Sequence, residues 1–288
     1  MPTLSLVCLT VIAGAQAAPR PPAGWVVRAV PADGSPEWHC ANLAHDEWVV
    51  SAEQEHLAIA MRSSLSLPKS LPFTPELAAG EAPNTFRGLR AVEPVSDGYL
   101  AGFTRGEFGG GLYWFSRGGE KHLKISPLSA SWFPENVQAM VKDGRAFYVF
   151  QGLAHLMTEK GRVLKVQQES GRGWVATVLV DLGAAPAAVF EELPGTWLVA
   201  TSSGLTRVAS RGTAEPIWQQ RKVGPLYPSS IARTSDGVVY IGMRAWVVRL
   251  TALSPGPALA DLLTPASCPA FAASEPCRCQ QAKDASHP

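Results

Sequence analysis

The sequence predicts an all-β fold that repeats a unit of four short strands. Glycines suited to tight turns recur at intervals of 46, 51 and 42 residues, at Gly98, Gly144, Gly195 and Gly237. Apolar runs precede these turns, and runs rich in β-branched and aromatic residues follow them, which is the pattern of short buried strands. Repeats of this length predict a β-propeller of five or six four-stranded blades.

The first and second strands of each unit flank the turn glycine. First strands are expected at 137–141, 187–190 and 230–232, and second strands at 147–150, 197–201 and 238–241. Asp-Gly pairs at Asp97, Asp143 and Asp236 favour hairpin turns that need a positive φ. The inner strands are apolar on both faces, as expected for sheets packed between neighbouring sheets.

A Gly-Leu step is expected to open the third strand, at Leu112, Leu153 and Leu205. A second glycine turn follows seven or eight residues later, at Gly119, Gly161 and Gly212, before a more polar fourth strand. A weaker copy without a turn glycine, HDEWVVSAEQEHLAIAM, surrounds Asp46. Five units can therefore be counted.

One of these units carries a family resemblance. The segment WLVATSSGLTRVASRG, residues 197–212, resembles the blade repeat of two-component regulator propellers, in which Gly-Leu, an Arg and a glycine turn follow a strand. VFQGLAHLMTEKG, residues 149–161, is less similar because His155 stands where Arg207 stands in the first segment. The resemblance covers about residues 90–250 and implies the propeller fold but no catalytic residues, so function has to be argued from a site.

Composition is consistent with one large all-β domain. The chain has 288 residues, of which 46% are hydrophobic, with 26 Gly and 24 Pro, and this favours a folded, turn-rich protein over a disordered one. The formal net charge is +1 and no basic run exceeds two residues, so the electrostatic pattern of nucleic-acid binding is missing. After the N-terminal apolar stretch, no segment approaches the length of a membrane span.

The N-terminus of the chain suggests export, and the rest of the chain divides into a domain and a C-terminal segment. Residues 1–17 are predicted to be a signal peptide with Ala15-Gln16-Ala17 as its cleavage site, the alternative being a first buried strand. The propeller domain is expected at 25–252, and a cysteine-containing C-terminal segment with a mobile tail at 253–288. Residues 63–85, rich in Pro and Ser, are expected to form a long connection between blades that is either functional or mobile.

Removal of the signal peptide would leave four cysteines, Cys40, Cys268, Cys277 and Cys279. An even number in an exported chain suggests disulfides, with three possible connectivities. A bridge from Cys40 to one of the later three would tie the ends of the ring together. A Cys277–Cys279 bridge is an alternative, whereas a zinc site is disfavoured because no C-x-x-C pair is present.

One face of the predicted propeller carries the candidate site. Loops between second and third strands share that face with the connections between blades, and the longest is FTRGEFGGG, residues 103–111. Gly109 to Gly111 permit backbone geometries closed to other residues. Glu107 and Phe108 lie at the loop tip, the alternative being a wide bulge with Phe108 folded back onto the blade. The candidate ligand-binding residues on this face are Arg105, Glu107, Phe108, Glu135, Tyr227 and Arg244.

Alternative roles remain open for several of these polar residues. Arg244 could instead bond loop carbonyls, and Tyr227 could be a packed ring with a tethered hydroxyl. Asn136 and Ser229 have turn capping as their commonest local role, and His155, at a repeat-equivalent position, is expected to be structural.

Catalytic signals are weak. The chain contains no G-x-S-x-G, H-E-x-x-H, P-loop or EF-hand pattern, so no catalytic residue, cofactor or metal is assigned. His39, His45 and His56 lie near Cys40 but are more typical of surface or packing positions. We therefore expect a monomeric, periplasmic or secreted binding module for a protein, peptide or glycan. The alternative is a hydrolase or lyase acting on an envelope polymer or small metabolite, with Glu107 and Glu135 as acid and base.

Overall fold

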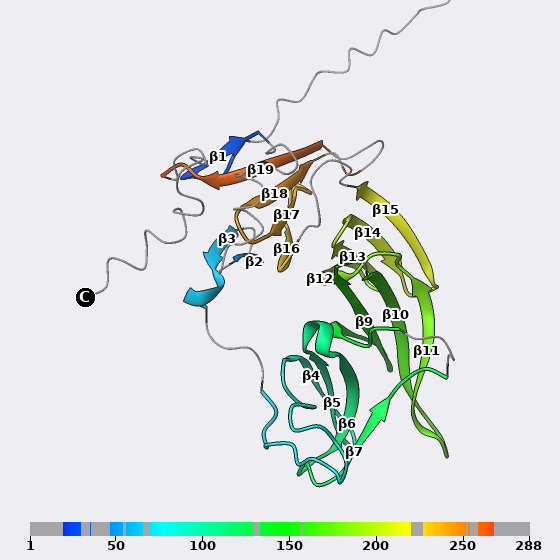
Figure 1. Cartoon of the computed structure of the whole chain (residues 1–288). Helices are drawn as coiled ribbons and strands as arrows, with labels where there is room; N and C mark the ends of the chain where they lie inside the picture. The colour runs from blue at the N-terminus through cyan, green and yellow to red at the C-terminus, as the bar shows by residue number, and fades with distance from the viewer. Residues whose placement is uncertain are drawn as a thin grey trace, which may run out of the picture.

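The computed structural model describes residues 20–29, 35, 47–53, 56–65, 70–128, 133–156, 158–219, 227–251, 253 and 259–267. Within these ranges the chain forms nineteen strands and two 3-10 helices of three residues each. The strands build five antiparallel sheets, which follow one another along an arc (Figure 1). The predicted all-β propeller fold is therefore confirmed.

Three blades are simple four-stranded meanders. The first contains β4 (Leu89–Val95), β5 (Gly98–Thr104), β6 (Gly110–Ser116) and β7 (His122–Ile125). The second contains β8 (Val137–Asp143), β9 (Ala146–His155), β10 (Thr158–Glu169) and β11 (Gly173–Asp181). The third contains β12 (Pro186–Leu193), β13 (Thr196–Thr201), β14 (Gly204–Ala209) and β15 (Thr213–Gln219).

The fourth sheet joins the two ends of the described chain. Its strands are β16 (Ser230–Arg233), β17 (Val239–Gly242), β18 (Val247–Thr251), β19 (Leu259–Pro265) and β1 (Trp25–Arg28). β1 pairs antiparallel with β19, and Arg28 Nε donates a hydrogen bond to Thr264 Oγ1 at 3.2 Å. The ends are thus tied by a strand pair. The predicted signal peptide and the four cysteines considered for a covalent tie lie outside the described residues.

The weaker N-terminal repeat forms a two-stranded sheet in the described part of the chain. It consists of β2 (Trp48–Glu53) and β3 (His56–Met61), followed by the 3-10 helix η1 (Arg62–Ser64). Trp48 and Val50 pack with Tyr240 and Val247 of the fourth sheet. This hairpin therefore covers one end of the arc.

The central blades are apolar on both faces because side chains of a strand alternate between its two sides. In β13, Trp197 and Val199 pack toward the second blade, where the Trp197 ring centroid lies 4.4 Å from that of Tyr148. Leu198 and Ala200 of the same strand pack toward the fourth sheet. The two-sided apolar pattern in the sequence is thus explained by blade stacking.

The Pro-rich connection covers the other end of the arc, at least over residues 70–88. Phe73 and Phe86 pack on Phe103 and Phe115, on the face of the first blade that points away from the second. The Phe86 and Phe115 ring centroids are 5.2 Å apart. In Figure 1 this blade and the β2–β3 hairpin lie apart at the two ends of the arc.

The predicted strand boundaries are correct for most hairpins and wrong for one. Gly144, Gly195 and Gly237 have φ values of +60°, +71° and +85°, as tight turns require. In the second blade, however, β9 continues through Gly152 to His155 and Gly161 lies inside β10. These two glycines face each other across the strand pair, and a Cβ on Gly161 would overlap the carbonyl oxygen of Ala184. They serve close packing and do not form a turn.

Candidate functional site

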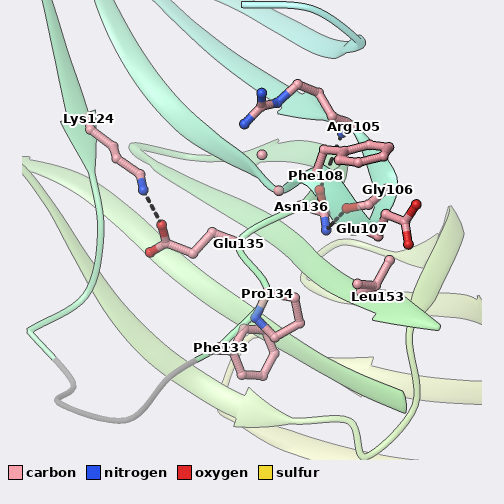
Figure 2. A pocket seen from close by; sticks show the side chains of 12 residues that line it. Arg105, Gly106, Glu107, Phe108, Lys124, Phe133, Pro134, Glu135, Asn136 and Leu153 are labelled. Atoms are coloured by element: carbon pink, nitrogen blue, oxygen red, sulfur yellow. Dashed lines mark hydrogen bonds and ion pairs between the residues drawn. The ribbon is translucent and has the colours of Figure 1, made fainter. Parts of the chain in front are cut away.

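A cavity of about 420 Å³ lies between the first and second blades. Its lining comes from the β5–β6 loop, from β7, from the connection that leads into β8, and from β9 (Figure 2). Four of the six predicted site residues line it, namely Arg105, Glu107, Phe108 and Glu135. The structure thus brings these four residues together at the junction of two blades, and their role in binding stays a prediction.

Glycines shape the β5–β6 loop. It contains the 3-10 helix η2 (Gly106–Phe108), and Gly109, which follows it, has φ +89° and ψ −166°, a region that is essentially restricted to glycine. A Cβ at Gly110 would overlap the carbonyl oxygen of Phe103 and lie 2.8 Å from Asn136 Oδ1. The glycines thus let the loop approach the connection into the second blade.

Asn136 links the two blades from a fully buried position. Its exposed fraction is 0%. Its Oδ1 accepts a hydrogen bond from Thr104 Oγ1 at 3.1 Å, and its Nδ2 donates to the carbonyl oxygen of Gly106 at 3.0 Å. A buried amide needs such partners. The turn cap considered for this residue is wrong, because the side chain crosses to the neighbouring blade.

Glu135 is held by two cations. Its Oε2 lies 2.5 Å from Lys124 Nζ, and its Oε1 lies 3.9 Å from Arg162 Nη2. The Lys124 pair is drawn in Figure 2 on one side of the cavity. The Glu135 carboxylate is therefore fixed from β7 of the first blade and from β10 of the second.

Arg162 supports the cavity wall from behind. It is 5% exposed, its Nε and Nη2 donate to Gln151 Oε1 at 3.0 and 2.9 Å, and its guanidinium lies 4.0 Å from the ring centroid of Phe133. Burial lowers the pKa of Arg162, and the Glu135 carboxylate opposes this shift. Arg162 therefore positions both Phe133 and Glu135.

The loop tip is tied to the second blade through Glu107. Glu107 Oε2 lies 2.7 Å from His155 Nε2. The neighbouring Phe108 side chain is 70% exposed, so the alternative in which its ring folds back onto the blade is wrong. The turn after His155 contains Leu156, which is 91% exposed and has a φ of +50°.

Arg105 is anchored through one edge of its guanidinium group. Nη1 donates to Asn84 Oδ1 at 2.7 Å. Nε is buried and makes no hydrogen bond to the described residues, and an unsatisfied buried donor costs about 1–3 kcal/mol. The site thus contains one donor without an acceptor in the described structure.

Tyr227 and Arg244 lie elsewhere. The guanidinium of Arg244 stacks 4.2 Å from the ring centroid of Tyr227, beside β16 and between β17 and β18, and neither residue lines the cavity. The structure therefore pairs these two candidates with each other and separates them from the other four.

Several residues of the site were not predicted from sequence as binding residues. Lys124 and Leu153 line the cavity, while Arg162 and His155 position its wall and rim. Each belongs to a strand whose sequence is ordinary for a blade, so only the juxtaposition of blades brings them to the cavity.

The described residues include no group of three or more His, Cys, Asp or Glu side chains arranged to hold a metal ion. Among the same residues, no helix has the length and apolarity needed to cross a membrane.

Comparison with known proteins yields structural similarity alone. No family model matches the chain, and no curated protein sequence matches it. Similar solved structures include the extracellular domain of a hybrid two-component system from B. thetaiotaomicron, with 14% identity and a TM-score of 0.36 over 59% of this chain and 21% of that one. A streptogramin B lyase has 15% identity and a TM-score of 0.38 over 60% and 54%.

A gluconolactonase from Xanthomonas campestris has 14% identity and a TM-score of 0.35 over 62% of each chain. The present chain thus spans less than two thirds of the length of each of these proteins. No ligand or activity is transferred from similarities at this level. The described residues form successive antiparallel sheets of a β-propeller, and the comparisons extend no further than this fold.

Proposed function

We propose that the protein is an exported, non-catalytic binding module that recognises a protein, peptide or glycan at the cavity between its first two blades. One observation carries this proposal: Phe108, 70% exposed, lines a cavity of about 420 Å³. The volume falls within the usual range of ligand sites, and aromatic residues dominate the binding energy of many interfaces.

The surroundings of Phe108 support a preorganised surface. The loop that carries it is fixed by the buried Asn136 amide and by the contact between Glu107 and His155. A loop already held in one conformation loses less conformational entropy on binding. A rigid, exposed ring beside a polar hollow is therefore suited to recognition.

A hydrolase or lyase is the second candidate, because Glu107 and Glu135 line one cavity. Paired carboxylates act in glycoside hydrolysis when one serves as the acid and the other as the base or nucleophile. Here Glu135 is ion-paired with Lys124, and Glu107 Oε2 lies 2.7 Å from His155 Nε2. Both carboxylates are already engaged by neighbouring side chains, so recognition is better supported than acid–base chemistry.

Two other parts of the proposal rest on the sequence. Export to the periplasm or cell exterior rests on the signal-like residues 1–17 and on the even number of remaining cysteines. The Tyr227–Arg244 pair is proposed as a separate contact area, since a cation stacked on an aromatic ring presents both charge and apolar surface.

The experiment is a pull-down from an envelope extract with wild type, Phe108→Ala and Leu193→Ala. Leu193 is a matched control because it is 64% exposed and ends β12, at a hairpin turn on the opposite face. We expect a partner that wild type and the Leu193 variant retain and the Phe108 variant loses. Equal retention by all three proteins would contradict this placement of the site, and turnover of extract polymers would favour the enzyme.

A further inference from the structure

The charges around the cavity identify the chemistry of a ligand, an inference that rests on the proposed function. We infer that the cavity receives the carboxylate of an acidic peptide side chain at Arg105, while an adjacent apolar side chain of the peptide contacts Phe108. The ligand class is therefore a short segment in which Asp or Glu neighbours an aromatic or aliphatic residue.

The first argument is the balance of charge. Arg105 and Lys124 line the cavity, and Arg162 lies behind its wall at 3.9 Å from Glu135. Both carboxylates of the lining already have side-chain partners: Lys124 Nζ for Glu135, and the imidazole of His155 for Glu107. An incoming cation would compete with these partners, whereas an incoming anion finds Arg105 without a carboxylate partner among the described residues.

The second argument is the edge of Arg105 that remains unused. Nη1 is held by Asn84, and Nε has no acceptor in the described structure. The Nε–Nη2 edge of a guanidinium binds an oxygen acceptor side-on, as Arg162 does with Gln151 at 3.0 and 2.9 Å. A carboxylate beside Arg105 would satisfy this edge with two charge-assisted hydrogen bonds.

The third argument is the glycine that borders that edge. Gly109 lies beside the guanidinium, since a Cβ built on it would be in van der Waals contact with Arg105 Nη2, at 3.5 Å. The φ of Gly109, +89°, disfavours any residue with a side chain. At position 109, therefore, no side chain covers Nη2, and a ligand reaches the buried Nε by a shift of the guanidinium toward the cavity.

The fourth argument is the apolar part of the lining. Figure 2 shows Phe108 and Leu153 on the opposite side of the hollow from the Lys124–Glu135 pair, with Phe133 and Pro134 along another edge. An acidic side chain alone would leave these groups in contact with water. An apolar neighbour in the peptide would cover them, which favours a peptide over a small inorganic anion.

The test uses three dipeptide probes with the full chain: N-acetyl-Glu-Phe-amide, its neutral isostere N-acetyl-Gln-Phe-amide, and N-acetyl-Lys-Phe-amide. Affinities are measured by NMR titration. We expect the Glu probe to bind about tenfold more tightly than the Gln probe, equivalent to about 1.4 kcal/mol, and the Lys probe to bind more weakly than either. Raising salt to about 0.5 M should weaken the Glu probe selectively, because ionic strength screens exposed charges.

Variants assign the effect to Arg105. Arg105→Gln should reduce the affinity of the Glu probe to that of the Gln probe and leave the Gln probe unchanged. Arg117→Gln is the matched control, since Arg117 lies at the other end of β6 and bonds the carbonyl oxygen of Ser96. Asn84→Ala keeps the Arg105 charge but removes its anchor, and should weaken the Glu probe several-fold. Thermal melting curves show whether each variant is folded. If a variant folds poorly, the salt series with wild type still tests the proposal.

The outcomes separate this inference from the proposed function. Equal affinity for the Glu and Gln probes, with both lost in Phe108→Ala, would overturn the carboxylate ligand and leave a binding site at the cavity. Tightest binding of the Lys probe would also overturn it. If no probe binds, the inference fails, and the envelope pull-down still tests the proposed function independently.

Discussion

Glu107 and His155 join two blades at the cavity rim, with Glu107 Oε2 lying 2.7 Å from His155 Nε2. Both side chains are partly exposed, 48% and 41% respectively, so the pair contributes little to overall stability. Its consequence is local, because Glu107 precedes the exposed Phe108 in η2. The pair therefore fixes the segment that the proposed function depends on.

We predict that His155→Ala changes the free energy of unfolding by at most about 1 kcal/mol, since exposed ion pairs are weak, but loosens residues 105–110. Hydrogen–deuterium exchange should show faster exchange in this loop while the strands of both blades keep their protection. Unchanged exchange in residues 105–110 would show that the pair does not hold the loop.

Arg162→Ala should be strongly destabilising. It removes the side chain that bonds Gln151, which is fully buried, and that stacks on Phe133. Breaking a buried polar arrangement costs about 3 kcal/mol, and guanidinium chloride denaturation measures the loss. Arg162→Met should lose less stability than Arg162→Ala, because the Met side chain keeps most of the volume of the Arg side chain. Wild-type stability of the Ala variant would refute the role assigned to Arg162.

Two glycines of the same loop should respond differently to alanine. Gly106 has φ +61° but open space around it, so Gly106→Ala should cost about 1 kcal/mol of backbone strain. Gly110→Ala places a Cβ against the Phe103 carbonyl and Asn136 and should cost about 2 kcal/mol or more. Chemical denaturation measures the unfolding free energy of both variants and so checks which loses more. Equal losses would argue against the close approach of Gly110 to Phe103 and Asn136.

Stability should fall above about pH 10, the ordinary pKa of tyrosine. Burial raises the pKa of Tyr113, Tyr148 and Tyr240. Above pH 10 the unfolded chain loses these protons while the folded chain retains them, so unfolding becomes more favourable as pH rises. Denaturation experiments between pH 8 and pH 11 should show the free energy of unfolding fall as pH rises. In Tyr113→Phe this free energy should fall less steeply with pH. A flat profile would contradict the burial of these hydroxyl groups.

The sequence predicted the blades because turn glycines and two-sided apolar strands are local signals. Gly144 and Gly195 form turns as expected, whereas Gly152 and Gly161 give the same local signal and instead permit close packing between strands. That difference depends on Ala184, which lies beyond the end of β11, and no local pattern reveals it.

The candidate site was predictable in part for the same reason. The glycine-rich loop is visible in the sequence, and so are the residues at its tip. Its partners Lys124, His155 and Arg162 come from β7, β9 and β10. Their roles follow only from how two blades pack, and the pairing of Tyr227 with Arg244 away from the cavity likewise depends on tertiary structure.

The central claim is that the cavity rim at Phe108 binds a partner. The most direct measurement is calorimetric titration of the partner recovered from the envelope extract into wild type, Phe108→Ala and Leu193→Ala, after equal melting temperatures have been verified. We predict an affinity at least about tenfold lower for the Phe108 variant, a loss of about 1.4 kcal/mol, and no change for the Leu193 variant. Equal affinities for all three proteins would contradict the account.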